Sequence, residues 1–149
     1  MNRQLFYEPL LHPDMIFPSL FRVNEAESHH ALRALRLAAG DTLSLTDGKG
    51  YFYTAEIAGT NGKSLEVILL TCVETTLKPA ASLHLAISPL KNPDRLEWLV
   101  EKAVETGVHS LSLLICERTE KPRVNTERLE RIAISALKQS LHAGLPPIR

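Results

Sequence analysis

The pattern of hydrophobic and polar positions changes near residues 75–81. Before that point, short apolar runs alternate with polar residues and are bounded by turn residues, as is typical of antiparallel strands. The strand-like runs cover residues 3–7, 15–23, 42–47, 51–58 and 64–70. The Asn61-Gly62 dipeptide is a strong hairpin signal. We therefore expect residues 1–74 to form a small, mostly antiparallel β-barrel.

One helix is expected within this region, over residues 24–37. Asn24 can cap its N-terminus, and Glu27, three residues later, completes a capping-box pattern. Gly40 suits the position just beyond its C-terminus, where a left-handed residue often ends a helix.

Residues 75–81 are interpreted as a linker, and residues 82–149 then alternate strand and helix. Strands are expected at residues 83–88 and 111–116, and the second is apolar enough to be covered on both faces of a parallel sheet. The predicted fold class is therefore α+β overall, with the small β-barrel followed by the first half of an α/β domain.

Asparagines mark the expected starts of two helices in this second part. Asn92, followed by Pro93, opens the first, and Asn125 opens the second. Gly107 is expected to end the first helix and Gly144 to close the second.

Two parallel strands and two helices do not complete such a domain. They cannot cover one another's apolar faces, and the chain stops at Arg149, where a third strand is expected. Either a partner completes the sheet or the chain is a fragment of a longer protein, and we favour the fragment.

The composition is that of an ordinary globular protein, with 149 residues, 44% hydrophobic and 23% charged. A formal net charge of zero argues against a broad polycationic surface but permits a basic patch. No apolar run approaches a membrane span, and the N-terminus lacks the apolar core of a secretory signal. Cys72 and Cys116 are expected to be buried free thiols in a reducing cytoplasm.

Basic residues of the first predicted helix are candidates for nucleic-acid binding. They are His29, Arg33 and Arg36, spaced by four and three residues on one helical face. Because arginine fits phosphate with a two-pronged fork, this face could grip an RNA backbone, and Arg3 and Arg22 could extend it. The alternative is a solvated face with salt bridges to Glu25 or Glu27.

A second candidate site lies at the carboxyl ends of the two predicted parallel strands, where open α/β sheets bind ligands. Lys91 follows the first strand and Arg118 the second, so we expect them to lie close together. The alternative is a weak surface pair between Arg118 and Glu117 or Glu120.

Other polar residues of the predicted helices have simpler explanations. Those of the first α/β helix, interpreted as a solvated face, are Glu97, Glu101, Lys102 and Glu105. Near the end of the last helix, Gln139 and Ser140 could bind a base or a partner, or could be a surface residue and a packing residue. The sequence has no glycine-rich phosphate loop, no nucleophile elbow and no metal-ligand spacing.

Motifs in order along the chain carry a resemblance to a known family. They are HHALRALRLAAGD at 29–41, DGKG at 47–50, YTAEI at 53–57, LK at 90–91, RLEW at 95–98, EKA at 101–103, ETGV at 105–108, ERT at 117–119 and KQS at 138–140. Together they resemble the bacterial 16S rRNA uridine-N3 methyltransferase family.

The resemblance implies a two-domain enzyme. A PUA-like N-terminal barrel would bind 16S rRNA of the small ribosomal subunit, and a C-terminal domain of the SPOUT class, with a trefoil knot and a homodimer interface, would bind S-adenosylmethionine. The enzyme would transfer a methyl group to N3 of a uridine. Since N3 is weakly acidic, a base or a polarising group must help to remove its proton.

The resemblance also implies roles for particular residues. Arg33 and Arg36 would hold RNA phosphates, and His142, at a position where many relatives have arginine, would be a further RNA contact. The catalytic candidates are Arg118, Lys91 and Gln139, with Arg118 positioning the rRNA or stabilising charge on the uracil oxygens.

No cofactor-binding residue is expected in this chain, because the family's glycine-rich cofactor loops would lie beyond it. We therefore expect an N-terminal portion that retains RNA binding but neither binds S-adenosylmethionine tightly nor methylates RNA. The rivals are a stand-alone RNA-binding module, whose α/β segment mediates assembly, and an interaction domain that does not bind RNA.

Overall fold

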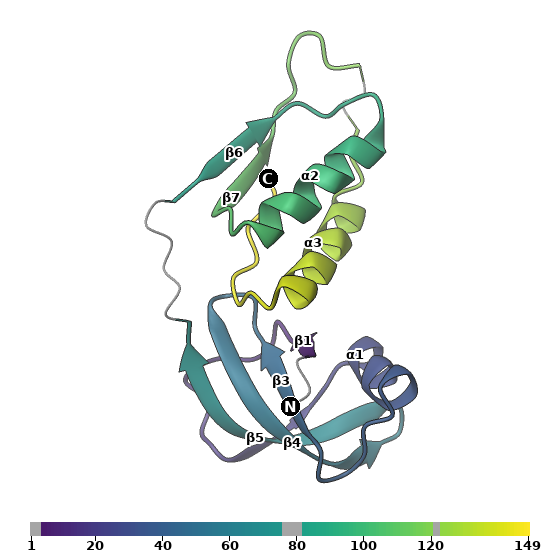
Figure 1. The fold of residues 1–149 in the computed structure, drawn as a ribbon, viewed down its shortest axis with the longest axis vertical. Coiled ribbons are helices and arrows are strands. Elements are labelled where there is room, and N and C mark those ends of the chain that lie inside the picture. Colours follow the sequence, from purple (N-terminus) through teal and green to yellow (C-terminus); the bar gives the residue numbers. More distant parts are fainter. Residues whose placement is uncertain (1–3, 76–81, 121–122) are drawn as a thin grey trace. The chain divides into compact units, whose positions relative to one another are not determined.

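The chain folds into two compact units, residues 1–76 and 77–149, which are described separately (Figure 1). The computed structural model describes residues 4–75, 82–120 and 123–149. Most of the predicted linker and Arg3 therefore lie outside the described residues. Both units contain helices and strands, as a mixed α+β fold requires.

A five-stranded sheet forms the N-terminal unit, in the order β1-β3-β4-β5-β2. Its strands are β1 (Leu5–Tyr7), β2 (Ser19–Arg22), β3 (Thr42–Thr46), β4 (Tyr51–Asn61) and β5 (Ser64–Glu74). β1 and β3 are parallel, and the other neighbours are antiparallel. The predicted strand over residues 15–23 is shorter than expected, since only Ser19–Arg22 pairs with β5.

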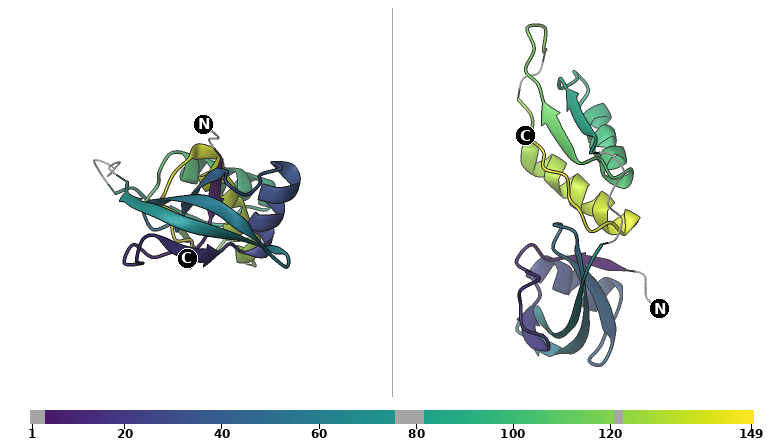
Figure 2. Two further views of the ribbon diagram at one scale, coloured as in Figure 1. Left: turned by 90° about the horizontal axis from the view of Figure 1, so that it is seen from below. Right: turned by 90° about the vertical axis from the view of Figure 1, so that its left-hand side faces the viewer.

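The long β4–β5 hairpin forms the centre of the sheet, as Asn61-Gly62 predicted (Figures 1 and 2). Gly62 adopts a φ of 64°, which the tight turn requires and which glycine adopts without steric cost. The register shifts at Thr54/Ala55 and at Ile57/Gly59. Such irregularities bend and twist a strand pair, which lets one sheet curve around its own core.

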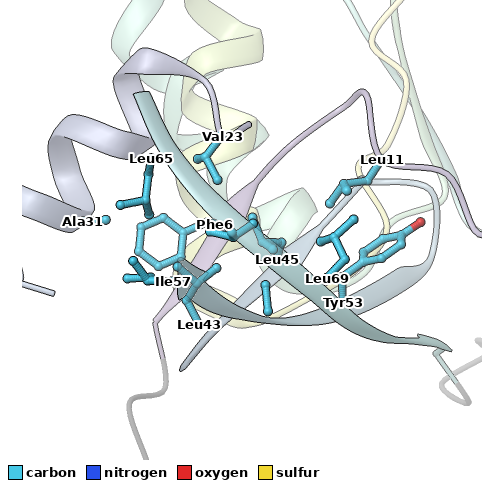
Figure 3. Packing of buried hydrophobic residues seen from close by; sticks show 12 residues of the cluster. Phe6, Leu11, Val23, Ala31, Leu43, Leu45, Tyr53, Ile57, Leu65 and Leu69 are labelled. Atoms are coloured by element: carbon cyan, nitrogen blue, oxygen red, sulfur yellow. The ribbon is translucent and has the colours of Figure 1, made fainter. Parts of the chain in front are cut away.

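Inward-facing side chains of this sheet form the core of the unit (Figure 3). The large, almost fully buried members include Phe6, Leu11, Leu45, Tyr53, Leu65 and Leu69. Each such side chain contributes roughly 1.5–3 kcal/mol when removed from water.

Two buried carboxylates, those of Asp47 and Glu8, accept hydrogen bonds from backbone and side-chain groups near this core. Asp47 accepts hydrogen bonds from the Lys49 backbone N–H (2.7 Å) and from the Tyr53 hydroxyl (3.2 Å), which fixes the turn after β3. Glu8 accepts from the backbone N–H (2.5 Å) and side chain (2.7 Å) of Asn24. Burial raises the pKa of Glu8 despite these hydrogen bonds.

Asn24 caps the first helix, but the helix differs from the prediction. Its side chain accepts from the Glu27 N–H (2.9 Å), while the Asn24 N–H that a capping box would give to Glu27 is donated to Glu8. Helix α1 covers Glu25–His29 and continues as a π-helical turn over His30–Ala34. The expected extension to residue 37 is therefore wrong.

The left-handed residue that follows this helix is Arg36, and not Gly40 as predicted. Arg36 has a φ of 55°, in the left-handed region, and the Leu37 N–H closes the turn on the Ala31 carbonyl (3.1 Å). Gly40, with a φ of 90°, belongs to the next turn, where its N–H bonds to the Ile57 carbonyl (2.9 Å).

The C-terminal unit contains β6 (His84–Ile87), α2 (Pro93–Glu105), β7 (Ser110–Leu113) and α3 (Thr126–Ser140). β6 and β7 form a parallel pair. Residues 147–149 run parallel along the other edge of β7, with the Leu111 N–H bonded to the Pro147 carbonyl (3.0 Å) and the Arg149 N–H to the Leu111 carbonyl (3.0 Å). A third parallel segment therefore begins where it was expected.

Both helix starts follow the prediction, whereas one helix end does not. Asn92 accepts from the Asp94 N–H (3.0 Å) and Asn125 from the Arg128 N–H (3.0 Å). Gly107, with a φ of 76°, follows α2. Helix α3 ends at Leu141, whose φ is 57°, and not at Gly144.

The second strand is shorter and more exposed than predicted. β7 ends at Leu113, and Leu114 and Ile115 are 45% and 62% exposed. Cys116 is also exposed, against the prediction of a buried thiol, whereas Cys72 is partly buried. The strand alternates serine and leucine, so only one of its faces is strongly apolar.

Candidate functional site

A basic hollow of about 520 Å³ lies at the carboxyl ends of β6 and β7. Its lining residues are Ser88, Pro89, Leu90, Lys91, Asn92, Arg95, Arg118, Thr119 and Glu120. The structure thus brings Lys91 and Arg118 to one site, as their positions after equivalent strands predicted.

Two loops are joined to form this hollow. The Ser88 and Thr119 hydroxyls are 2.7 Å apart, which links the loop after β6 to the loop after β7. Thr119 also accepts a hydrogen bond from the Cys116 N–H (2.8 Å). These contacts hold the backbones of the two loops together. Lys91, on one loop, and Arg118, on the other, therefore line the hollow from fixed positions.

Positive charge dominates the hollow. Glu120 pairs with Lys91 (3.3 Å) and not with Arg118, and both members of the pair are exposed. Within the described residues Arg118 has no ion pair, so its guanidinium can bind an anionic ligand. Arg95 adds a third cation. It was not predicted as a site residue, although it opens the RLEW motif and lies four residues after Lys91.

An apolar hollow of about 420 Å³ adjoins the basic one. It is lined by Ile87, Leu90, Asp94, Arg95, Trp98 and Leu99. Leu90 and Arg95 line both hollows, so these two residues lie at the boundary between them.

Gln139 and His142 lie at the other end of this unit. Helices α2 and α3 pack side by side (Figure 1), with their N-terminal turns together around Asp94 and Arg128. At their C-terminal ends, the ring of His142 lies against Gly107. A helix as long as α3 spans roughly 20 Å, so Gln139 is not brought to the basic hollow within one chain.

The basic face of the first helix is only partly as predicted. His29 and Arg33 are exposed on the helical segment, but Arg36 lies beyond its end and not on the same helical face. Arg33 and Arg36 form no ion pair with another described residue. Arg22, on β2, pairs with Glu66 (3.5 Å).

The polar residues of α2 that were predicted to form a solvated face are only partly exposed, and they form ion pairs. Lys102 bridges Glu101 (2.8 Å) and Glu105 (2.9 Å), and the hydrogen bond from Lys102 lowers the pKa of the partly exposed Glu101. Glu97 has another role, because it receives a two-pronged pair from Arg128 of α3 (2.6 and 2.8 Å).

The Ser140 hydroxyl is hydrogen-bonded within its own helix. Its hydroxyl donates to the Ala136 carbonyl (2.7 Å), which favours the packing explanation over binding of a base. No group of three or more His, Cys, Asp or Glu side chains in the described segments could hold a metal ion. No helix of these segments has the length and hydrophobicity needed to span a membrane.

Family models match both units of the chain. Residues 23–70 match an RNA methyltransferase PUA domain, and residues 77–149 match an RNA methyltransferase domain. The two matches define a class of RNA methyltransferase proteins in which a PUA domain precedes the methyltransferase domain.

Sequence relatives place the chain more closely within this class. It is 27% identical over 95% of its length to the ribosomal RNA small subunit methyltransferase E of Synechocystis, and 22% identical over 86% to that of Bacillus subtilis. The chain belongs to this RNA methyltransferase family. It spans about half the length of these relatives, 46% and 52% respectively.

Solved structures agree with this assignment. A probable rRNA-methyltransferase from Porphyromonas gingivalis is 42% identical, with a TM-score of 0.87. A ribosomal RNA small subunit methyltransferase E from Neisseria gonorrhoeae, bound to S-adenosyl methionine, is 26% identical, with a TM-score of 0.81. Each match covers 98% of this chain and 59% or 60% of the solved chain.

Proposed function

We propose that this chain serves S-adenosylmethionine-dependent methylation of a uridine at N3 in 16S rRNA, and that its own residues bind the RNA. Family membership and the names of the relatives support the reaction and the rRNA substrate. The observation that carries the RNA-binding part is the basic hollow, where Lys91, Arg95 and Arg118 converge at the ends of two parallel strands.

The proposed work of the hollow is electrostatic. Lys91 and Arg95 neutralise backbone phosphates, as lysine and arginine do in RNA-binding proteins generally. Arg118, which is without an ion pair among the described residues, faces the charge that spreads to the uracil oxygens when N3 loses its proton. Gln139 can join this site only from another copy of the chain, which agrees with a homodimer of SPOUT type.

The basic hollow does not fit the methyl donor. S-adenosylmethionine carries a positive sulfonium, which the three cations of the basic hollow would repel. We therefore assign no cofactor-binding residue to the basic hollow. When bound, the donor supplies the methyl group.

In the N-terminal unit we assign RNA backbone contacts to exposed basic residues. They are His29, Arg33 and Arg36, with Arg22, Arg3 and His142 as further contacts of the chain. The reaction would take place on the small ribosomal subunit in the cytoplasm.

Salt-dependent binding of a 16S rRNA fragment tests the role of the hollow. Lys91→Ala and Arg95→Ala should each weaken binding and lower the slope of log K against log salt by about 0.7 to 0.9. Lys102→Ala is the matched control, because it removes the same charge from an ion-paired face of α2. Equal effects of Lys102→Ala and Arg95→Ala on the salt slope would contradict the assignment.

A stand-alone RNA-binding module that assembles through its α/β unit is the second candidate. The exposed Leu114 and Ile115 after β7 favour it, since exposed apolar side chains often mark contact surfaces. Sedimentation of the chain with and without Ile115→Asp separates the two. A dimer that the substitution dissolves without loss of RNA affinity would favour the module.

A further inference from the structure

An exposed tryptophan lies beside the basic hollow. Trp98 is on the solvent side of α2 and is 61% exposed, whereas Leu96 and Val100, its neighbours two residues away on either side, are buried. A tryptophan side chain that is exposed to water lacks the large stabilisation that burial of its ring would give. Packing of the unit therefore does not explain why a tryptophan stands at position 98. Its indole forms no hydrogen bond with another described residue.

The surroundings of Trp98 combine an apolar surface with a cation. Trp98, Leu90 and Leu99 give the 420 Å³ hollow apolar walls, and Arg95 separates it from the basic hollow. Asp94 is the one acidic lining residue, and it lies in the first turn of α2, where a negative charge stabilises the helix. The site therefore offers a flat ring on one side and phosphate-binding groups on the other.

A nucleotide matches both parts of this site, because it joins a flat base to an anionic phosphate. Unpaired bases stack on aromatic rings because every base has a π-face, and the adjoining phosphate binds lysine or arginine. We propose that Trp98 is the stacking platform for an unpaired base of the RNA, with Arg95 binding the phosphate that connects this base to the strand in the basic hollow. This inference rests on the proposed function, since it requires that the basic hollow bind RNA.

Charge favours RNA over a protein as the occupant. A purely apolar partner would cover Trp98 and Leu90 but would also bury Arg95 beside them, and an unpaired buried cation is costly. Together, the lining residues of the two hollows include three cations and two carboxylates, Glu120 and Asp94, and Glu120 is already paired with Lys91. Arg95 and Arg118 therefore remain available for anions.

Trp98 is the only tryptophan of the chain, so its fluorescence reports on this site alone. The 149-residue chain is titrated with a short single-stranded oligouridylate, and with an abasic oligomer of equal length and charge. Binding is followed both by Trp98 fluorescence and by anisotropy of the labelled RNA. We expect oligouridylate to quench Trp98 with the same midpoint as the anisotropy, and the abasic oligomer to bind at least fivefold more weakly without quenching.

Substitutions then separate stacking from charge. Trp98→Ala should weaken oligouridylate binding by about 5- to 100-fold while leaving the affinity for the abasic oligomer unchanged. Trp98→Phe, which keeps an aromatic face, should stay within about threefold of the wild type. Arg95→Ala should weaken both oligomers. Because Trp98→Phe retains the shape of the site, it keeps the proposal testable if Trp98→Ala perturbs the fold.

The outcomes distinguish this inference from the function on which it rests. RNA binding that depends on Arg118 but leaves Trp98 fluorescence unchanged overturns the stacking site alone. Absence of any salt-dependent RNA binding overturns both. Quenching by S-adenosylmethionine alone, or a blue shift that appears with protein concentration, would assign Trp98 to the cofactor or to a second copy and would overturn the proposal.

Discussion

Replacing Arg36 by glycine is expected to stabilise the N-terminal unit and, at the same time, to weaken RNA binding. Arg36 has a φ of 55°, and a left-handed conformation costs a non-glycine residue roughly 1–2 kcal/mol. Glycine removes this cost but loses about 0.5–1 kcal/mol more backbone entropy on folding. We therefore expect the free energy of unfolding to rise by about 0.5–1 kcal/mol, which corresponds to a rise in melting temperature of about 2–8 °C for a unit of this size.

Urea unfolding followed by two signals measures this gain. Far-ultraviolet circular dichroism reports both units, whereas the fluorescence of Trp98 reports only the C-terminal one. Arg36→Gly should shift the transition of the N-terminal unit upward and leave the Trp98 transition in place. Arg33→Ala, which removes the same charge from the helical segment, should change the free energy of unfolding by less than about 0.5 kcal/mol.

RNA binding should respond in the opposite direction. Loss of one phosphate contact lowers the slope of log K against log salt by about 0.7 for a single strand, and Arg36→Gly and Arg33→Ala should share this effect. The reasoning is refuted if Arg36→Gly is no more stable than the wild type, since the left-handed backbone would then carry no cost. An unchanged salt slope would remove Arg36 from the RNA surface.

Four further substitutions test the packing of the two units. Because burial raises the pKa of Glu8, the folded state holds its proton more tightly than the unfolded state, whose value is about 4.3. Stability should fall as the pH rises from that value through the folded pKa, and Glu8→Gln should flatten the urea-unfolding profile over this window. Tyr53→Phe should cost about 1–2 kcal/mol by circular dichroism, since buried Asp47 loses a donor. Glu97→Gln should cost about 1 kcal/mol in the Trp98 transition, and Arg128→Ala should add little on that background.

Local chemistry explains why most element starts could be predicted. Asn24, Asn92 and Asn125 cap helices by accepting hydrogen bonds from N–H groups two or three residues further along, so each signal lies within one turn of sequence. The same holds for the turn at Gly62. The convergence of Lys91 and Arg118 could also be predicted from the sequence, because parallel strands end at one edge of their sheet.

Features that depend on distant contacts could not be predicted in this way. The Asn24 N–H is donated to Glu8, sixteen residues away, which a capping-box pattern does not reveal. The π-helical turn and the left-handed Arg36 replace the predicted helix to residue 37 with Gly40 beyond it, since packing of the helix on the sheet decides where it stops. Grouping Gln139 with Lys91 relied on motif order, and motif order carries no information about which end of a helix faces a site.

The parallel arrangement of α2 and α3 has a consequence for the charge of the C-terminal unit. Aligned peptide dipoles give each helix roughly half a positive charge at its N-terminus. Both N-terminal turns lie at the same end, the one where β6 and β7 finish. Part of the attraction for anions is therefore built into the backbone, and it should persist at any pH and after every lysine and arginine of the hollow has been replaced by alanine.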